Sequence, residues 1–253
     1  MKSLPAVLLA LSLAACAPAG ETASAPDPGA SYAAALADPQ RPQADRDRDA
    51  ARLPGEILAF AQIAPGEKVG DYIMGGGYWT RILANVVGPQ GKVYAFQPDE
   101  FIAFRPAYGD EQTAAATGRA NVVPLRGPVA SPPFPEKLDT IVTVQNMHDL
   151  YIGAMPQGTG PKALKALYDA LKPGGTLLVV DHSAAEGAGL AAANSVHRMD
   201  RQAAIAALTA TGFRVEAESA IYIRPDDPRT ANVFDPAIRG KTDQFVLRLR
   251  KPG

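Results

Sequence analysis

The 253-residue chain contains a single cysteine, Cys16, so no disulfide can form within it and no set of cysteine ligands can hold zinc. Histidine occurs only three times and tryptophan once. Basic and acidic residues nearly balance, 25 against 26, and no basic stripe is present, so nucleic acid is not an expected partner. After the first 16 residues, no apolar run approaches the length needed to span a bilayer.

The N-terminal residues have the pattern of an export signal. Met1-Lys2 gives a positive start, residues 4–13 are apolar, and "LAAC" places small residues before Cys16. This ending resembles the bacterial lipobox, in which cleavage precedes a cysteine that takes the lipid. We therefore expect an exported, periplasmic lipoprotein anchored to the membrane through Cys16, and Ala17 favours the outer membrane. The alternative is an uncleaved apolar N-terminus with a chance cysteine.

Three segments are expected: a signal peptide over residues 1–15, a lipidated flexible tether over 16–31, and one folded domain over 32–253. The tether is rich in small residues and proline and has few large apolar side chains. Burial of its side chains therefore cannot offset the entropy cost of ordering it. The remaining residues, some 220, suffice for one substantial core.

Strand and helix patterns alternate from residue 53 to the C-terminus. Strands are expected at 68–73, 92–97, 121–127, 138–145 and 176–182, and the last two of these are expected to be buried. Helices are expected at 53–63, 78–87, 161–175 and 200–213, with Pro-Gly-Gly at 173–175 and Gly212 as the stops of the last two. Alternating strands are expected at 214–223 and 243–250. This order predicts an α/β fold with a mainly parallel seven-stranded sheet, helices on both faces and an antiparallel C-terminal strand pair. Ligands of such sheets bind beyond the carboxyl ends of the strands, where strand order reverses.

A glycine turn follows the first expected strand. Asp71 is followed by Gly75, Gly76 and Gly77, and a helix begins near residue 78. Glycine permits positive φ and close approach of a ligand to the backbone, and the helix start offers free N–H groups. The position where such turns usually carry their first glycine is occupied by Ile73.

Several segments together resemble the class I S-adenosylmethionine-dependent methyltransferases. They are "DYIMGGGYWT", "VYAFQP", "LDTIVTVQNMHDL", "ALKPGGTLLVVD" and the terminal strand pair, and the resemblance covers roughly residues 53–251. The chain is also similar to a bacterial group of exported, predicted methyltransferases, on "GGGYWT", "VYAFQP", "NMHD", "HRMD" and "TDQFVLRLRKP". The resemblance implies a Rossmann-like fold and S-adenosylmethionine as cofactor. The cofactor-binding residues it implies are Asp71, Gly75, Gly76, Gly77, Gln97 and Asn146.

Three positions depart from the methyltransferase pattern. Besides Ile73, Gln97 stands where an acidic residue would grip the ribose hydroxyls, and Pro128 stands where an aspartate would meet the adenine amine. Each lost contact costs about 1–3 kcal/mol. Asp99 and Glu100 are candidates to replace the ribose contact from the next turn.

The three histidines are expected on the ligand side of the sheet. His148 and His182 follow the fourth and fifth strands, and His197 precedes the late helix, whose cap is expected to be Asp200. We predict His148, Asp149 and His182 as catalytic residues, with a base that removes the acceptor's proton as the methyl group arrives. Structural roles for His182 and His197 are the alternative. No metal site is predicted, because no two histidines share a helical or strand spacing.

A long polar loop over residues 224–243 separates the last two strands. Loops of this length often act as lids or binding loops. Arg229, Arg239 and Lys241 are candidates to meet an anionic group there, or form an ordinary solvated surface.

Two kinds of function stay open from the sequence. The first is methyl transfer from S-adenosylmethionine to a small-molecule or envelope-associated acceptor. The second is a non-catalytic periplasmic lipoprotein that kept the fold and lost the reaction, which the export signal and the altered cofactor positions favour. A different reaction on the same scaffold is a third possibility, since fold does not fix function.

Overall fold

The computed structural model describes Met1 and residues 28–253, so the expected signal peptide and Cys16 lie outside the described residues. Helix α1 spans Pro28–Leu36. Residues 28–31, which were expected to end the tether, form the first turn of this helix. No helix between residues 28 and 253 has the length and apolar character needed to cross a bilayer.

The centre of the molecule is one seven-stranded sheet with the order β3-β2-β1-β4-β5-β7-β6. β1 to β5 are parallel to one another, and β7 is antiparallel to both β5 and β6. This confirms the predicted mainly parallel sheet with an antiparallel C-terminal pair. The strands are β1 Lys68–Tyr72, β2 Lys92–Pro98, β3 Val122–Gly127, β4 Leu138–Val144, β5 Leu171–His182, β6 Arg214–Ser219 and β7 Gln244–Arg250.

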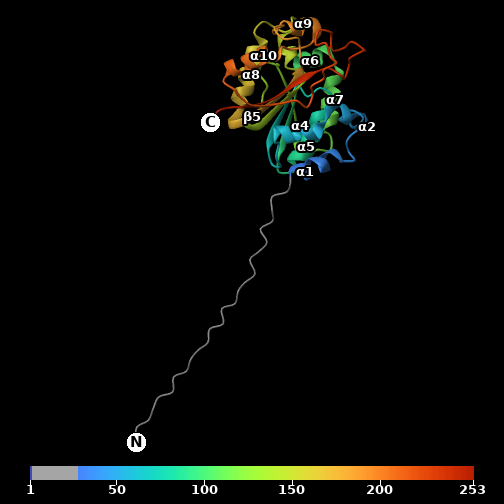
Figure 1. Ribbon diagram of the computed structural model, residues 1–253. Coiled ribbons are helices and arrows are strands. Elements are labelled where there is room, and N and C mark those ends of the chain that lie inside the picture. The colour runs from blue at the N-terminus through green and yellow to red at the C-terminus, as the bar shows by residue number, and fades with distance from the viewer. Residues whose placement is uncertain (2–27) are drawn as a thin grey trace.

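Helices cover both faces of the sheet (Figure 1). One apolar cluster joins α1, α4 and α5 to the sheet, and a second joins α8 and α10 to its opposite face. Besides α1, the helices are α2 Gln43–Arg46, α3 Asp49–Arg52, α4 Pro54–Ala61, α5 Tyr78–Val87, α6 Asp99–Phe104, α7 Ala107–Ala116, the 3-10 helix η1 His148–Tyr151, α8 Thr159–Ala170, α9 Ala192–Val196 and α10 Arg201–Thr211.

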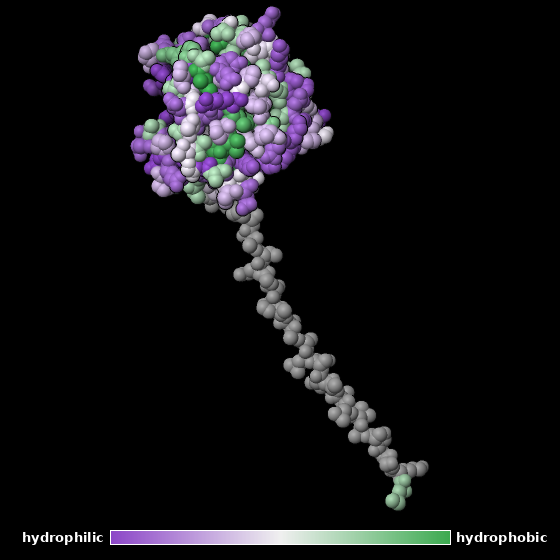
Figure 2. All heavy atoms as spheres, turned by 180° about the vertical axis from the view of Figure 1, so that it is seen from behind, coloured by the Kyte–Doolittle hydropathy of each residue, from purple (hydrophilic) through white to green (hydrophobic). Residues whose placement is uncertain are grey.

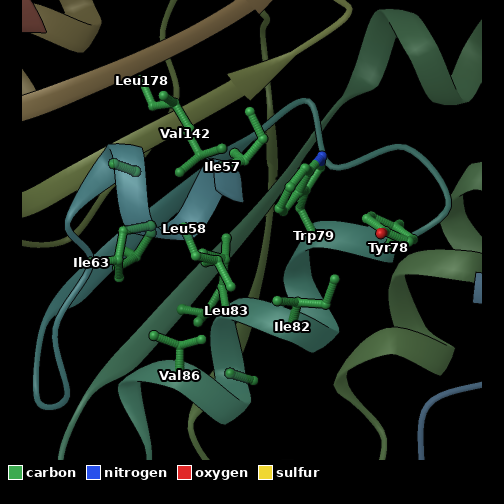
Figure 3. Packing of buried hydrophobic residues seen from close by; sticks show 14 of the residues in the cluster. Ile57, Leu58, Ile63, Tyr78, Trp79, Ile82, Leu83, Val86, Val142 and Leu178 are labelled. Carbon is green, nitrogen blue, oxygen red and sulfur yellow. The ribbon is translucent and has the colours of Figure 1, made fainter. Parts of the chain in front are cut away.

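Helix α5 is fixed by its buried face. Ile82 and Leu83 of α5 are fully buried and belong to the same apolar cluster as Ile57 of α4 and Val142 and Leu178 of the sheet (Figure 3). Burial of one such side chain contributes about 1.5–3 kcal/mol. The apolar face therefore fixes α5 against the sheet, and with it the turn that precedes the helix. The surface seen from behind is mostly hydrophilic, with hydrophobic residues gathered near its middle (Figure 2).

Two boundaries differ clearly from the expectation: β6 ends at Ser219 instead of residue 223, and the boundary between α8 and β5 is shifted. The helix expected to stop at the Pro-Gly-Gly of residues 173–175 ends at Ala170, and the "LKPGG" segment is the start of β5, which was expected to begin at residue 176. Leu171 is fully buried and pairs with Leu138 of β4, with a register irregularity between this pair and the rest of the ladder. Sheet pairing thus overrides the helical pattern there.

The fold places a switch point between β1 and β4. The chain proceeds from β1 to β2 and β3 on one side and from β4 to β5 on the other. The loops that follow β1 and β4 therefore meet at one edge of the sheet, where a ligand is expected. In Figure 1, α6 and α9 lie toward this end of the molecule and α1 toward the opposite end.

Candidate functional site

The turn after β1 has a glycine-like backbone at Ile73. Its φ is +59°, in the left-handed region that β-branched residues rarely adopt, at a cost of about 1–2 kcal/mol. Asn146 stabilises this conformation, because its Nδ2 donates to the carbonyl oxygens of Ile73 at 3.0 Å and Tyr72 at 3.3 Å. The Ile73 side chain is 6% exposed and belongs to one of the two apolar clusters. The isoleucine therefore does not prevent the turn from forming.

Gln97 lies beneath the turn. Its side chain is fully buried, and its Oε1 accepts a hydrogen bond from the backbone N–H of Gly75 at 2.9 Å. Its Nε2 has no hydrogen-bond partner within the described part of the chain. Gln97 does not line the nearby cavity. The structure therefore gives it a role in holding the glycine turn, in place of the expected contact with a ribose.

A cavity of about 210 Å³ lies between this turn and the end of β4. Phe101 and Tyr108, from the helices after β2, line its β2 side, and Asn146 and Asp149 line its β4 side. It is further lined by residues of the turn and of the N-terminal segment: Arg48, Arg52, Asp71, Ile73, Met74, Gly75, Gly76, Tyr78, Trp79, Val144 and Gln145. A larger hollow, about 500 Å³, lies beside β6 and β7 and is lined by none of the predicted catalytic or cofactor-binding residues, although Arg229 lines it.

Asp71 is a buried carboxyl group on the cavity wall. It is 4% exposed, and its Oδ2 accepts a hydrogen bond from Thr80 Oγ1 at 2.6 Å. Burial raises the pKa of Asp71 to about 6, although the hydrogen bonds from Thr80 oppose the rise. The site therefore holds a carboxylate at neutral pH that a cationic group would stabilise.

His148 lies between two carboxyl groups. Its Nδ1 is 2.7 Å from Asp181 Oδ1, its backbone N–H donates to Asp181 Oδ2, and its Nε2 is 3.4 Å from Asp149 Oδ1. Burial disfavours the imidazolium, but Asp181 and then Asp149 outweigh it and raise the pKa of His148 to about 9. Burial also raises the pKa of Asp149 to about 6, against the effect of His148. At neutral pH both groups are charged, and Asp149 is the one that reaches the cavity.

The structure brings the three histidines together. The ring of His148 is 5.9 Å from that of His182 and 5.7 Å from that of His197. Burial lowers the pKa of His182 to about 4, and its Nδ1 lies 2.8 Å from Thr242 Oγ1. None of the three lines the cavity. Among the described residues, no group of three or more histidine, cysteine, aspartate or glutamate side chains is arranged to hold a metal ion.

The loop after β6 is fixed to the histidine cluster. Arg198 is fully buried, donates to both carboxylate oxygens of Asp227 at 2.7 and 2.9 Å, and donates to the carbonyl of Ala231. The same loop places Phe234 against the ring of His197, at 4.9 Å. Arg229, Arg239 and Lys241, by contrast, are exposed.

Asp200 has the predicted capping role. Its Oδ1 accepts hydrogen bonds from the backbone N–H groups of Gln202 and Ala203, at the start of α10. Its Oδ2 accepts one from Gly187, so the carboxylate also joins a loop to the helix. Asp200 is therefore a structural residue.

Sequence reasoning missed the N-terminal part of the site. Arg48 and Arg52 line the cavity from the end of the segment that carries α2 and α3. Their spacing in the sequence could have indicated that Arg48 and Arg52 lie on the same side, because residues four apart share a helical face. Two such short helices give little periodicity, so the segment was not assigned.

The pKa of His148 predicts how stability changes with pH. The pKa of His148 is about 9 in the folded protein and 6.5 in the unfolded chain. The protonated imidazole therefore stabilises the fold fully below pH 6.5, and this stabilisation is lost as the pH rises through about 9. The groups that face His148 titrate lower: Asp149 at about 6, His182 at about 4, and His197 and Asp181 below their ordinary values. Urea unfolding should therefore show a loss of about 2 kcal/mol between pH 7 and pH 9.

The matched variant is His148→Gln, which removes the titrating group. We expect its unfolding free energy to be nearly constant over the same pH range. A parent protein whose stability is equally constant would contradict the assigned charge of His148.

Comparison with known proteins identifies the fold. No family model matches the chain. It is 28% identical to the demethylmenaquinone methyltransferase of Geobacillus stearothermophilus over 132 residues, and this match spans about half the length of each protein. A solved methyltransferase from Aquifex aeolicus described as SAM dependent superposes with a TM-score of 0.57 at 21% identity, over 89% of this chain and 98% of that one.

A second solved structure shows the range of this fold. The cyclase SpnF superposes with a TM-score of 0.55 at 17% identity, over 80% of this chain and 81% of its own. With the Aquifex structure, it shows that the chain has the Rossmann-like fold of class I methyltransferases. The reaction has to be inferred from the residues of the site, because proteins of one fold catalyse different reactions.

Proposed function

We propose that the protein is an S-adenosylmethionine-dependent methyltransferase acting on a small-molecule or envelope-associated acceptor. The observation that carries this proposal is the polar cavity at the switch point between β1 and β4, bounded by a glycine turn and reached by Asp149. Export and lipidation at Cys16 are part of the proposal and are supported by the pattern of residues 1–16.

The residues of the cavity fit an adenosyl cofactor. A Cβ added at Gly75 would meet no atom within 4 Å, so the backbone leaves open space beside the cavity. Phe101 and Tyr108 line the cavity with aromatic rings, a residue type suited to packing against a purine. Trp79 lines the same cavity, and its buried indole N–H has no partner among residues 28–253, which leaves a donor for a polar ligand atom. Asp149 adds a negative charge suited to a cationic group.

When bound, S-adenosylmethionine supplies an electrophilic methyl group. Asp149 is the residue placed to take the proton that the acceptor loses, because it is ionised at neutral pH and its raised pKa makes it a stronger base than an ordinary aspartate. His148 orients and stabilises that carboxylate from behind, and Asp181 keeps His148 protonated. His148 therefore acts as a positioning residue in this scheme.

The acceptor class is suggested by one relative. The Geobacillus protein is named for demethylmenaquinone, and the matched region spans half of it. Reduced demethylmenaquinone is therefore the first acceptor to try, as an acidic hydroxyl compound that resides in membranes.

Gly75→Val is expected to weaken binding of S-adenosylhomocysteine by about 100-fold, because the added side chain occupies space that the cofactor needs. The measurement is isothermal titration calorimetry on the full chain. Gly66→Val is the matched control, because Gly66 also has positive φ and open space at its Cβ but does not line the cavity. Equal affinity of the Gly75→Val variant and the parent would contradict the placement of the site.

A further inference from the structure

Two arginines reach the cavity without a carboxylate partner. The Arg52 guanidinium lies 4.7 Å from the centroid of the Tyr78 ring, and its NH2 donates to Gln145 Oε1 at 3.3 Å. Arg48 lies 5.2 Å from the same ring. Within residues 28–253, no aspartate or glutamate oxygen comes within 4 Å of either guanidinium, and both residues line the cavity. Two positive charges therefore face the ligand space uncompensated.

The other arginines near the turn are paired. Arg41 binds both carboxylate oxygens of Asp49, at 2.8 and 2.6 Å. Arg81 binds both oxygens of Asp45, at 2.6 and 3.0 Å. The aspartates of this segment that could neutralise a buried arginine are thus already occupied.

The environment of Arg52 disfavours its own charge. Burial, followed by the charge of Arg48, lowers the pKa of Arg52 to about 10. The contact with Tyr78 and the hydrogen bond to Gln145 keep the Arg52 guanidinium from extending into solvent. An anion in the cavity would relieve this cost.

The fold places the positive charge of Arg52 at one end of the cavity. Phe101 and Tyr108 lie on the β2 side, whereas Gln145, which bonds to Arg52, follows β4 on the other side of β1. A ligand with a flat aromatic group and a charged group would place the first toward Phe101 and the second toward Arg52. S-Adenosylmethionine has this polarity, with adenine at one end and an amino-acid group at the other.

We propose that Arg52, assisted by Arg48, binds the carboxylate of the amino-acid portion of the cofactor. This rests on the proposed function. A guanidinium presents a planar fork that matches a carboxylate through two parallel hydrogen bonds. The buried carboxyl group of Asp71, which interacts electrostatically with Arg52, complements the neighbouring ammonium group. The zwitterionic end of the ligand thus meets charges of both signs.

The test compares two ligands that differ in the amino-acid portion. S-Adenosylhomocysteine carries it, and 5′-methylthioadenosine lacks it. In calorimetric titrations of the full chain, Arg52→Gln should weaken S-adenosylhomocysteine about 10- to 100-fold and change 5′-methylthioadenosine less than threefold. Arg48→Gln should show the same selectivity with a smaller effect, because Arg48 is exposed.

Arg46→Gln is the matched control. Arg46 belongs to the same segment but does not line the cavity, and its side chain donates to the carbonyl of Asp38. We expect it to bind both ligands like the parent, with an unchanged thermal melting profile in all three variants confirming that they fold.

Two outcomes would overturn the assignment of Arg52: equal weakening of both ligands, or unchanged affinity for S-adenosylhomocysteine. Either would leave the proposed function in place, since the parent still binds an adenosyl ligand. A parent protein that binds neither ligand would overturn the proposed function and this inference together.

Discussion

Asp227→Ala is expected to lower the free energy of unfolding by about 3–5 kcal/mol, because it leaves the fully buried guanidinium of Arg198 without its carboxylate. The same carboxylate accepts backbone hydrogen bonds from Asp243 and Arg229, which are also lost. Chemical denaturation followed by circular dichroism measures the effect directly.

An exposed ion pair provides the control. Arg201 and Glu218 are paired, with side chains 45% and 43% exposed, so Glu218→Ala should cost no more than about 1 kcal/mol. If Asp227→Ala cost as little as Glu218→Ala, the buried pair would not be what holds this part of the fold together.

This pair matters for the site because it fixes the loop between β6 and β7. Arg198 bonds to Asp227 and Ala231 of the loop, and the backbone of Val233 bonds to Val196 beside the histidine cluster. The sequence predicted a lid or binding loop over residues 224–243. The structure shows a segment anchored by a buried ion pair, which supports the position of His197.

Asp149→Asn is expected to reduce the rate of methyl transfer by about 10²–10⁴-fold, because an amide cannot accept the acceptor's proton. The assay follows tritium from the methyl group of S-adenosylmethionine into reduced demethylmenaquinone. In the parent, the rate should rise with pH through about 6, where Asp149 loses its proton. The variant should lack that rise.

The control for Asp149 separates chemistry from binding. Asp149→Asn should bind S-adenosylhomocysteine within tenfold of the parent, and Asp169→Asn, whose carboxylate is 54% exposed on α8, should keep the parent's rate. An Asp149→Asn variant that retains the parent's rate within tenfold would exclude Asp149 as the base.

The central strands of the sheet could be predicted because they are buried on both faces. Apolar runs such as residues 138–144 and 176–182 leave few alternatives, and α5 spans the predicted residues 78–87 because its apolar face repeats with helical periodicity. The α8–β5 boundary was wrong because pairing of Leu171 with Leu138 depends on a strand 33 residues earlier in the chain.

The roles of individual site residues were harder to predict, because they depend on contacts between distant segments. Gln97 was expected at a ribose, but its amide reaches Gly75 and holds the turn. Ile73 stands where such turns usually carry their first glycine, and a left-handed backbone and a hydrogen bond from Asn146 accommodate it there. His148 and Asp149 were predicted as a pair, and the structure shows that Asp149 alone lines the cavity.

Calorimetric titration of the full chain with S-adenosylhomocysteine tests the cofactor site most directly. We propose that the cavity between the glycine turn and β4 holds the adenosyl cofactor in spite of Ile73 and Gln97. We expect a saturable isotherm with one ligand bound per chain. Absence of binding heat at millimolar ligand, with the protein folded, would contradict it.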